Sequence, residues 1–355
     1  MITKIVKVTE EQIRQDDSKA VHEIRKAGEI IKNGGLVAFP TETVYGLGGD
    51  ALNPESSGKI YKAKGRPSDN PLIVHISKLE DLNVITEDVP EIGHVLARHF
   101  WPGPLTMIFK KSEKVPKETT GGLDTVAVRM PRHRTALALI REAGGFIAAP
   151  SANISGRPSP TLAKYVQEDM DGRIDMIIDG GIIEIGLEST IIDLTEEIPI
   201  ILRPGFITRE MLEAVIGTVR IDQTLMDGDS LQIPKAPGMK YRHYAPKGEL
   251  TIVDGEPDHV ADYINNTYHN CHNAGKKVGV IATQENLGRY QADCVKCIGR
   301  RQDEEGIAKE LYRILREFDD EETEVILSES FHTTGMGQAI MNRLLKAAGH
   351  KKIQV

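Results

Sequence analysis

The chain has 355 residues, and its 44 lysines and arginines against 52 aspartates and glutamates give a formal net charge of −8. This balance argues against a surface built as a whole to hold nucleic acid or an anionic membrane, although it is compatible with a local basic pocket. A hydrophobic share of 40% and a charged share of 27% exclude wholesale disorder, and the length predicts two domains.

No targeting or membrane signal stands out. There is no run of about 18–20 apolar residues, so we predict no membrane span. The N-terminus lacks a basic and then apolar leader and soon reaches Glu10 and Glu11, so we expect no signal peptide. Three cysteines cannot form a disulfide framework in a chain of this length, which indicates a reducing compartment and predicts a cytoplasmic location.

The first two hundred residues alternate apolar runs with amphipathic stretches. Apolar residues recur at helical spacing from Val21 to Ile31, and Gly34–Gly35 ends that pattern. Further helices are expected at 55–64, 91–100, 134–143 and 161–169, and strands at 36–40, 72–76, 105–109, 125–130, 146–149, 176–178, 190–194 and 198–202. Helices do not separate every pair of strands, so the pattern predicts a mixed, twisted α/β sheet.

The periodicity is lost between residues 221 and 248, where prolines, glycines and aspartates indicate a linker. After it, strands at 250–253, 278–282, 294–298 and 325–327 alternate with helices at 258–274, 285–290, 304–318 and 337–348. We therefore predict an N-terminal catalytic α/β domain at 1–220, a linker at 221–248 and a small C-terminal Rossmann-like parallel α/β domain at 249–355.

Polar residues follow the predicted strands of the first domain. The segment Phe39–Gly48 places hydroxyls and a carboxylate directly after a strand, where ligand crevices form, and a simple hairpin has about equal weight. Lys62, Lys64 and Arg66 at a helix end could meet a phosphate chain, or only complement the helix dipole. Arg129 would suit a carboxylate, although such an arginine is more often a solvated edge cation.

Other candidates are weaker. The loop 150–161 allows close approach to a ligand, but Thr161 could equally be an N-cap. His75, inside an apolar strand, is usually a core residue. Cys294 and Cys297 suggest zinc, yet strand alternation points them to opposite faces, which argues against a metal site. The segment Thr333–Gly337 could receive an anion at a helix start or simply cap it. P-loop, Gly-x-Ser-x-Gly and His-Glu-x-x-His signatures are absent.

Four motifs in one order carry a resemblance: Phe39–Leu47, Lys64–Leu72 with His75, Pro150–Asn153 and Leu202–Gly205. Together they resemble the L-threonylcarbamoyladenylate synthase family, and the linker and tail resemble its long, two-domain form. The similarity implies that L-threonine, bicarbonate or CO2, and ATP give L-threonylcarbamoyl-AMP and pyrophosphate. It also implies that other proteins, threonylcarbamoyl transferases, pass the product to tRNA, with weak or no direct tRNA binding by this chain.

The resemblance also implies roles for individual residues. Lys64 and Arg66 are the expected catalytic residues, and Mg2+ is expected to arrive with the ATP phosphates rather than on protein ligands. The expected ATP contacts are Lys64, Arg66, Asn70, Thr125, Ser151, Asn153, Thr161, Arg203 and Tyr244. The expected L-threonine contacts are Thr41, Thr43, His75, Arg129 and Ser189, with Thr41 and Thr43 not separable.

Two further hypotheses concern the linker and the basic residues. The linker carries Lys240, Arg242 and Tyr244, and we expect it to close over the nucleotide as a lid, because a carbamate decarboxylates readily in water. The alternative function is an RNA-binding module whose patch around Lys64 and Arg66 holds a phosphate backbone without catalysis.

Overall fold

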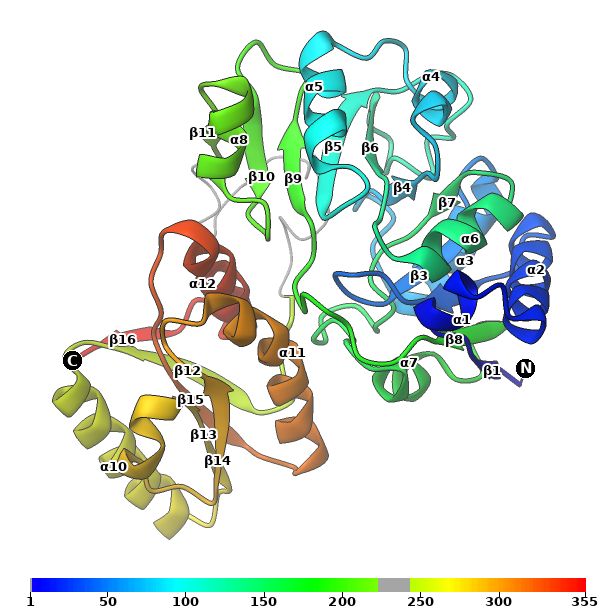
Figure 1. Ribbon diagram of the computed structural model, residues 1–355. Coiled ribbons are helices and arrows are strands. Elements are labelled where there is room, and N and C mark those ends of the chain that lie inside the picture. Colours follow the sequence, from blue (N-terminus) through cyan, green and yellow to red (C-terminus); the bar gives the residue numbers. More distant parts are fainter. Residues whose placement is uncertain (1, 223–242) are drawn as a thin grey trace. The chain divides into compact units, whose positions relative to one another are not determined.

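The computed structural model describes residues 2–222 and 243–355, so most of the predicted linker lies outside the described residues. The chain divides into two compact units. The first comprises 1–155, 159–184 and 188–240, and the second comprises 156–158, 185–187 and 241–355. The two units are described separately (Figure 1).

The first unit is built on one mixed sheet with the strand order β1-β8-β2-β3-β7-β4-β6-β5-β9-β10-β11. Its strands are β1 Lys4–Lys7, β2 Val37–Phe39, β3 Gly46–Asp50, β4 Ile73–His75, β5 Leu105–Lys110, β6 Thr125–Arg129, β7 Ile147–Ala148, β8 Met176–Asp179, β9 Thr190–Asp193, β10 Ile200–Arg203 and β11 Arg220–Ile221. The sheet contains parallel pairs, such as β4 with β6, and antiparallel pairs, such as β5 with β6. The predicted mixed α/β sheet is therefore confirmed.

The helices of this unit include those that the periodicity predicted, together with three that it did not predict, at 10–14, 82–85 and 209–216. The helices are α1 Glu10–Arg14, α2 Ser18–Lys32, α3 Pro54–Lys64, α4 Leu82–Ile85, α5 Glu91–Phe100, α6 Arg134–Glu142, α7 Ala163–Met170 and α8 Arg209–Ile216, with a 3-10 turn η1 at Leu79–Asp81. Asp17 caps α2 by accepting hydrogen bonds from the backbone N–H groups of Lys19 and Ala20. The apolar face of α2 packs beside α6 in one core cluster, and Figure 1 shows the two helices side by side.

The second unit contains five strands that are all parallel, in the order β14-β13-β15-β12-β16. The strands are β12 Glu249–Asp254, β13 Val278–Thr283, β14 Cys294–Gly299, β15 Val325–Glu329 and β16 Lys352–Gln354, and the helices are α10 Pro257–Asn273, α11 Glu304–Asp320 and α12 Gly335–Ala347. The predicted parallel α/β architecture is confirmed. The segment expected as a helix at 285–290 is a 3-10 helix, η2, at Gln284–Arg289.

Two short segments that are distant in sequence belong to this second unit. Arg316 of α11 is fully buried, and its Nε and Nη2 donate to the Pro158 carbonyl at 3.1 and 2.7 Å. The backbone N–H of Ala245 donates to the Gly156 carbonyl at 2.8 Å. A Cβ atom at Gly186 would lie 2.5 Å from the Cα atom of Lys309, so the close approach requires glycine there.

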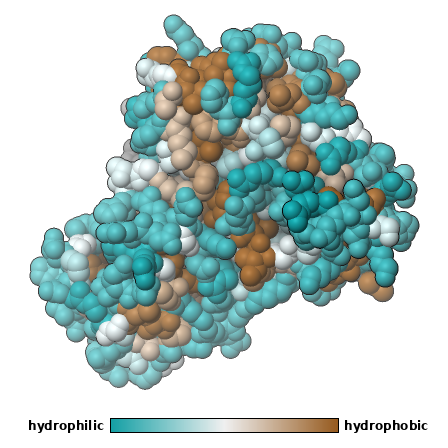
Figure 2. All heavy atoms as spheres, in the orientation of Figure 1, coloured by the Kyte–Doolittle hydropathy of each residue, from teal (hydrophilic) through white to brown (hydrophobic). Residues whose placement is uncertain are grey.

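The described part of the surface is typical of a globular α/β protein. The face drawn in Figure 2 is mostly hydrophilic, with apolar residues in small patches. Within the described ranges, no helix combines the length and the apolar character needed to cross a membrane.

Candidate functional site

The first group of site residues lies on the turn between β2 and β3. These strands pair antiparallel, with Phe39 opposite Gly46. The segment Phe39–Gly48 is therefore a hairpin, which was one of the two interpretations of its sequence. The Thr41 hydroxyl donates to the Val44 carbonyl at 2.7 Å and lies 2.9 Å from the Thr43 hydroxyl. The hairpin therefore does use a threonine to satisfy backbone groups, and it also buries Thr43 beside the end of β6.

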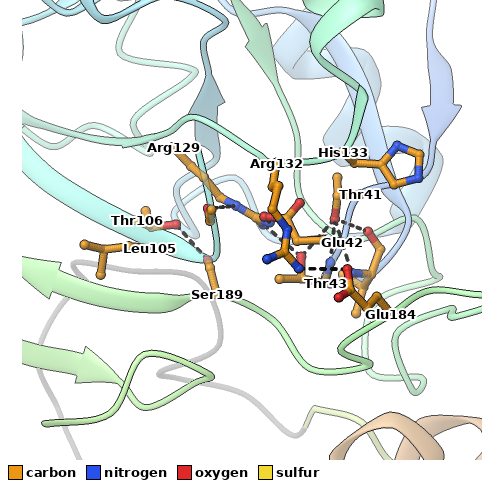
Figure 3. A network of polar contacts seen from close by, with 12 residues as sticks. Thr41, Glu42, Thr43, Leu105, Thr106, Arg129, Arg132, His133, Glu184 and Ser189 are labelled. Atoms are coloured by element: carbon orange, nitrogen blue, oxygen red, sulfur yellow. Dashed lines mark hydrogen bonds and ion pairs between the residues drawn. The ribbon is translucent and has the colours of Figure 1, made fainter. Parts of the chain in front are cut away.

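Arg129 is the centre of this group (Figure 3). It ends β6, opposite His75 of β4 and Thr106 of β5, and it is only 4% exposed, so it is not a solvated edge cation. Nη1 donates to the Thr43 hydroxyl at 2.8 Å, and Nε donates to the Gly103 carbonyl at 3.3 Å. Nη2 lies 2.8 Å from Oε1 of Glu42.

Arg129 donates hydrogen bonds to described residues from Nε and Nη1, whereas Nη2 contacts Glu42 as an ion pair without hydrogen-bond geometry. One N–H on each terminal nitrogen is left for a further acceptor. A planar guanidinium with two such donors suits a carboxylate.

Glu42 is the carboxylate noted in the segment Phe39–Gly48, to which the sequence analysis assigned no role. Its side chain is 2% exposed and forms an ion pair with Arg129. Burial acts to raise the pKa of Glu42, but the Arg129 guanidinium outweighs this effect and holds the pKa below its usual range. The carboxylate therefore stays charged and neutralises Arg129. Only its position directly after a buried strand could have pointed to it.

His75 contributes a neutral ring to the same region. It is 4% exposed, its Nδ1 lies 3.1 Å from the Ile73 carbonyl oxygen, and its ring packs edge-on against Phe39. Burial and the nearby Arg129 charge lower the pKa of His75 to about 3. The imidazole is therefore uncharged at neutral pH.

Ser189 and Arg203 complete the first group. The Ser189 hydroxyl lies 2.7 Å from the Thr106 hydroxyl, and Figure 3 shows the two facing each other. Arg203 donates from Nη2 to the Ser189 hydroxyl at 3.1 Å and from Nε to its carbonyl at 3.0 Å. The structure thus places Arg203, expected among the nucleotide contacts, next to Ser189, expected among the threonine contacts.

A second group forms around the end of α3. Gly65 ends the helix with φ of +60°, which turns the chain directly after Lys64. Lys64 is 1% exposed and donates from Nζ to the carbonyl oxygens of Ser151 and Asn153, both at 2.5 Å. The Ser151 hydroxyl donates to Oδ1 of Asn153 at 2.5 Å.

Arg66 and Asn70 extend this second group. Arg66 donates from Nη2 to Oδ1 of Asn70 at 2.5 Å and to the Pro71 carbonyl at 3.1 Å. Both side chains are buried. The two groups meet along the hairpin, because Gly46 of β3 forms a β-bridge with Ser151. The structure therefore brings most of the predicted site residues into one region of the first unit.

Three predicted residues lie apart from these contacts. Thr125 begins β6 and is half-buried, four residues before Arg129. Thr161 is buried but does not cap α7, whose N-cap is Leu162, so the N-cap interpretation is wrong. Tyr244 belongs to the second unit, where its ring lies 5.1 Å from that of Tyr312.

The weaker candidates lose support as ligand sites. The three cysteines are free, and the described residues contain no cluster of three or more His, Cys, Asp or Glu side chains suited to a metal. At the start of α12, the chain's own Glu304 carboxylate accepts a hydrogen bond from the Gly337 N–H at 3.1 Å. An internal carboxylate thus occupies the position proposed for an external anion.

The geometry also disfavours the RNA-binding alternative. Lys64 and Arg66 are 1% and 9% exposed, so they do not form a surface patch for a phosphate backbone. Arg132, which is exposed, forms an ion pair with Glu184 at 2.8 Å. A site formed by buried side chains suits a small molecule better than the backbone of a polymer.

Comparisons with known proteins identify relatives of this α/β protein. The family model described as "Telomere recombination" matches residues 29–205, and that of the "Threonylcarbamoyl-AMP synthase, C-terminal domain" matches residues 207–349. The chain is 50% identical to the threonylcarbamoyl-AMP synthase of Bacillus subtilis, over 94% of each chain. It is 52% identical to that of Pyrococcus abyssi, over 94% of this chain and 96% of the relative.

A solved structure extends the similarity to three dimensions. Pyrococcus abyssi Sua5 complexed with L-threonine matches with a TM-score of 0.92 and 49% identity, over 99% of this chain and 100% of that chain. The fold and the site thus define a two-domain α/β protein with a small-molecule site. The chain belongs to the threonylcarbamoyl-AMP synthase family.

Proposed function

We propose that this chain makes L-threonylcarbamoyl-AMP from L-threonine, bicarbonate or CO2, and ATP, with release of pyrophosphate. The observation that carries the proposal is the buried Arg129, which lies among threonine and serine hydroxyls at the end of β6. Membership of the family and the relative solved with L-threonine support it.

In the proposed reaction, the guanidinium of Arg129 binds the carboxylate of L-threonine with its two remaining N–H donors. Thr41, Thr43 and Ser189 supply hydroxyls around the substrate, and neutral His75 adds no competing positive charge. Holding the amino acid by its carboxylate leaves the amine able to attack the carbon donor. The new N–C bond gives an N-carboxylated threonine, with loss of a proton when the donor is CO2 and of water when it is bicarbonate. Glu42 keeps Arg129 in position and balances its positive charge. The site therefore contains no unpaired buried charge before the substrate binds.

The second half of the proposed reaction is nucleotidyl transfer. The new carboxylate attacks the α-phosphorus of ATP, the bond to the β-phosphate oxygen breaks, and pyrophosphate leaves. We assign Lys64, Arg66 and Asn70 to the phosphates, and Thr125, Ser151, Asn153, Thr161 and Arg203 to the rest of the nucleotide. Mg2+ bound to the ATP phosphates would neutralise their charge. Such chemistry depends on positioning and charge neutralisation, which buried cations provide.

Three finer parts of the function remain proposals. The product is passed to tRNA-modifying threonylcarbamoyl transferases, the protein works in the cytoplasm, and the linker at 221–248 closes as a lid with Tyr244 touching the nucleotide. Residues 223–242 of that lid lie outside the described residues.

A pyrophosphate-release assay with mass detection of the adenylate tests the main proposal. With ATP, Mg2+ and bicarbonate, we expect release that depends on L-threonine. Arg129→Lys keeps the charge but loses the planar fork. The KM for L-threonine should rise roughly 10-fold to 100-fold, which corresponds to the free energy of one charge-assisted hydrogen bond. The matched control is Arg132→Lys, three residues away but exposed and paired with Glu184, which should leave the KM unchanged.

Two results would contradict the proposal. One is pyrophosphate release that is independent of L-threonine, and the other is no release from protein whose Trp101 fluorescence shows a native fold. If Arg129→Lys raised the KM for ATP rather than for L-threonine, Arg129 would belong to the nucleotide instead.

A further inference from the structure

The sheet of the second unit has a feature that α/β proteins use for binding. From β13 the chain continues to β14 on one side of the sheet, whereas from β15 it continues to β16 on the other side. The chain therefore changes direction between the neighbouring strands β13 and β15. In open parallel sheets, ligands bind outside the carboxyl ends of the strands at such a switch point.

A buried charged network lies at this point. β15 ends at Glu329, whose side chain is 3% exposed. Its carboxylate accepts hydrogen bonds from the backbone N–H of Thr283 at 2.9 Å and from Nδ2 of Asn286 at 3.0 Å. It also forms an ion pair with Arg301, which donates in addition to the Ser330 carbonyl at 2.9 Å. The network fixes these side chains in one arrangement, as a binding site requires.

A cavity of about 180 Å3 opens beside the network. Val253 and Val260 form an apolar wall, and Asn286, Tyr290, Arg301 and Glu329 form a polar wall. Tyr290 is 8% exposed, and its hydroxyl lies near the Glu329 carboxylate but makes no hydrogen bond of good geometry within the described part of the chain. A buried hydroxyl without a partner costs free energy, so such a group in a native protein calls for an explanation.

The charges around the cavity constrain what could occupy it. Arg301 and Glu329 neutralise each other, so the polar wall carries no net charge. Asp254, at the end of β12, is neutralised by an ion pair with Lys352 at 2.7 Å, whereas Glu256, the N-cap of α10, places a carboxylate next to the lining residues Gly255 and Pro257, where it opposes a phosphate. Burial and the nearby Glu329 carboxylate raise the pKa of Tyr290, so the hydroxyl keeps its proton and remains a donor.

We propose that this cavity of the C-terminal domain binds a small uncharged ring that carries hydroxyl or carbonyl groups, with Tyr290 as its main hydrogen-bond partner. The cavity is smaller than the roughly 300–1,000 Å3 of sites for drug-sized ligands, which limits the ligand to about one ring. The apolar wall packs against one face of the ring, and the polar wall contacts its edge. None of the residues that line this cavity is among those assigned to threonylcarbamoyl-AMP synthesis.

Methyl NMR of the full chain tests this site directly. With the valine methyl groups labelled, Val253 and Val260 report on the cavity and not on the residues assigned to ATP or L-threonine. D-ribose and uracil are the probes, because they are neutral single rings with hydroxyl and carbonyl groups respectively. We expect at least one of them to shift both methyl signals in a saturable manner at millimolar concentration.

Two variants sharpen the test. Tyr290→Phe keeps the ring but removes the hydroxyl, and it should weaken probe binding roughly threefold to tenfold, the range of a neutral hydrogen bond. Threonine-dependent pyrophosphate release should be unchanged in this variant. Val260→Phe fills the cavity and should abolish the shift of the Val253 methyl signals, which remain as the reporter in this variant.

Three outcomes would overturn the inference. The first is no shift of either methyl group at tens of millimolar of both probes. The second is equal binding to the wild type and to Tyr290→Phe, which would remove the hydroxyl from the site. The third is a response to inorganic phosphate instead of the neutral probes, because the ligand would then be an anion.

Discussion

Two buried carboxylates, Glu42 in the first unit and Glu329 in the second, each pair with an arginine beside the carboxyl end of a strand. In the first pair both side chains are enclosed, with 5% of Arg129 and 2% of Glu42 exposed. In the second pair Arg301 is 34% exposed, while Glu329 is 3% exposed. In the enclosed pair, removal of either side chain would leave an unpaired buried charge, so each partner requires the other. In the half-open pair, the arginine is partly solvated and can turn away from Glu329 into water.

The largest expected effect comes from breaking the enclosed pair. Glu42→Gln keeps the shape of the side chain but leaves Arg129 charged and buried, so the free energy of unfolding should fall by about 3–5 kcal/mol. Urea unfolding followed by fluorescence measures this change, since Trp101 is the single tryptophan and lies buried in the first unit. Glu184→Gln, which breaks the exposed pair with Arg132, should cost at most about 1 kcal/mol. A loss no larger than this control would show that the enclosed pair is not obligatory.

An intermediate effect is expected from pH. The pKa of His75 is about 3 in the folded protein and about 6.5 when unfolded, so the unfolded chain binds the extra proton between these values. Stability should therefore be at its full value above pH 6.5 and fall by up to about 1.4 kcal/mol per pH unit below it. His75→Phe keeps a ring against Phe39 and should reduce this slope between pH 6.5 and 5. An unchanged slope would mean that His75 is solvated or charged in the folded state.

The smallest effect is expected at the half-open pair. Arg301→Gln leaves Glu329 with its hydrogen bonds from Thr283 and Asn286, and the lost ion pair is partly solvated, so the cost should be about 1 kcal/mol. Hydrogen exchange of β13 and β15 amides, read by mass spectrometry, follows this local stability. Exchange accelerated as strongly as expected for a loss of 3 kcal/mol or more would place this pair in the same class as Glu42 and Arg129.

The elements with a clear hydrophobic period could be predicted from the sequence. Helices α2 and α11 and the strands β5 and β13 lie close to their expected ranges, because burial of one face imposes the period that the sequence shows. Strand β3 could not be recognised, since Gly46-Leu47-Gly48-Gly49-Asp50 has neither β-branched nor aromatic side chains. The short edge strand β16 carries too few residues for a pattern to emerge.

The site was predictable in its residue types and less so in its pairings. Arg129, Lys64 and Arg66 stand out because cations follow strands and helix ends in a Gly-rich context. The pairing of Arg129 with Glu42 spans 87 residues and depends on which strands become neighbours, which no local pattern encodes. The proximity of Arg203 to Ser189 likewise follows from the antiparallel pairing of β9 with β10.

The tripeptides Gly156–Pro158 and Ile185–Leu187 have a consequence for engineering this chain. Each belongs to the second unit although both flanking sequences belong to the first, and Arg316 holds the Pro158 carbonyl. A single crossover near residue 240 would therefore separate α11 from the two tripeptides that contact it. To exchange C-terminal domains between relatives, three pieces have to be transplanted together, with both tripeptides taken from the donor of α11.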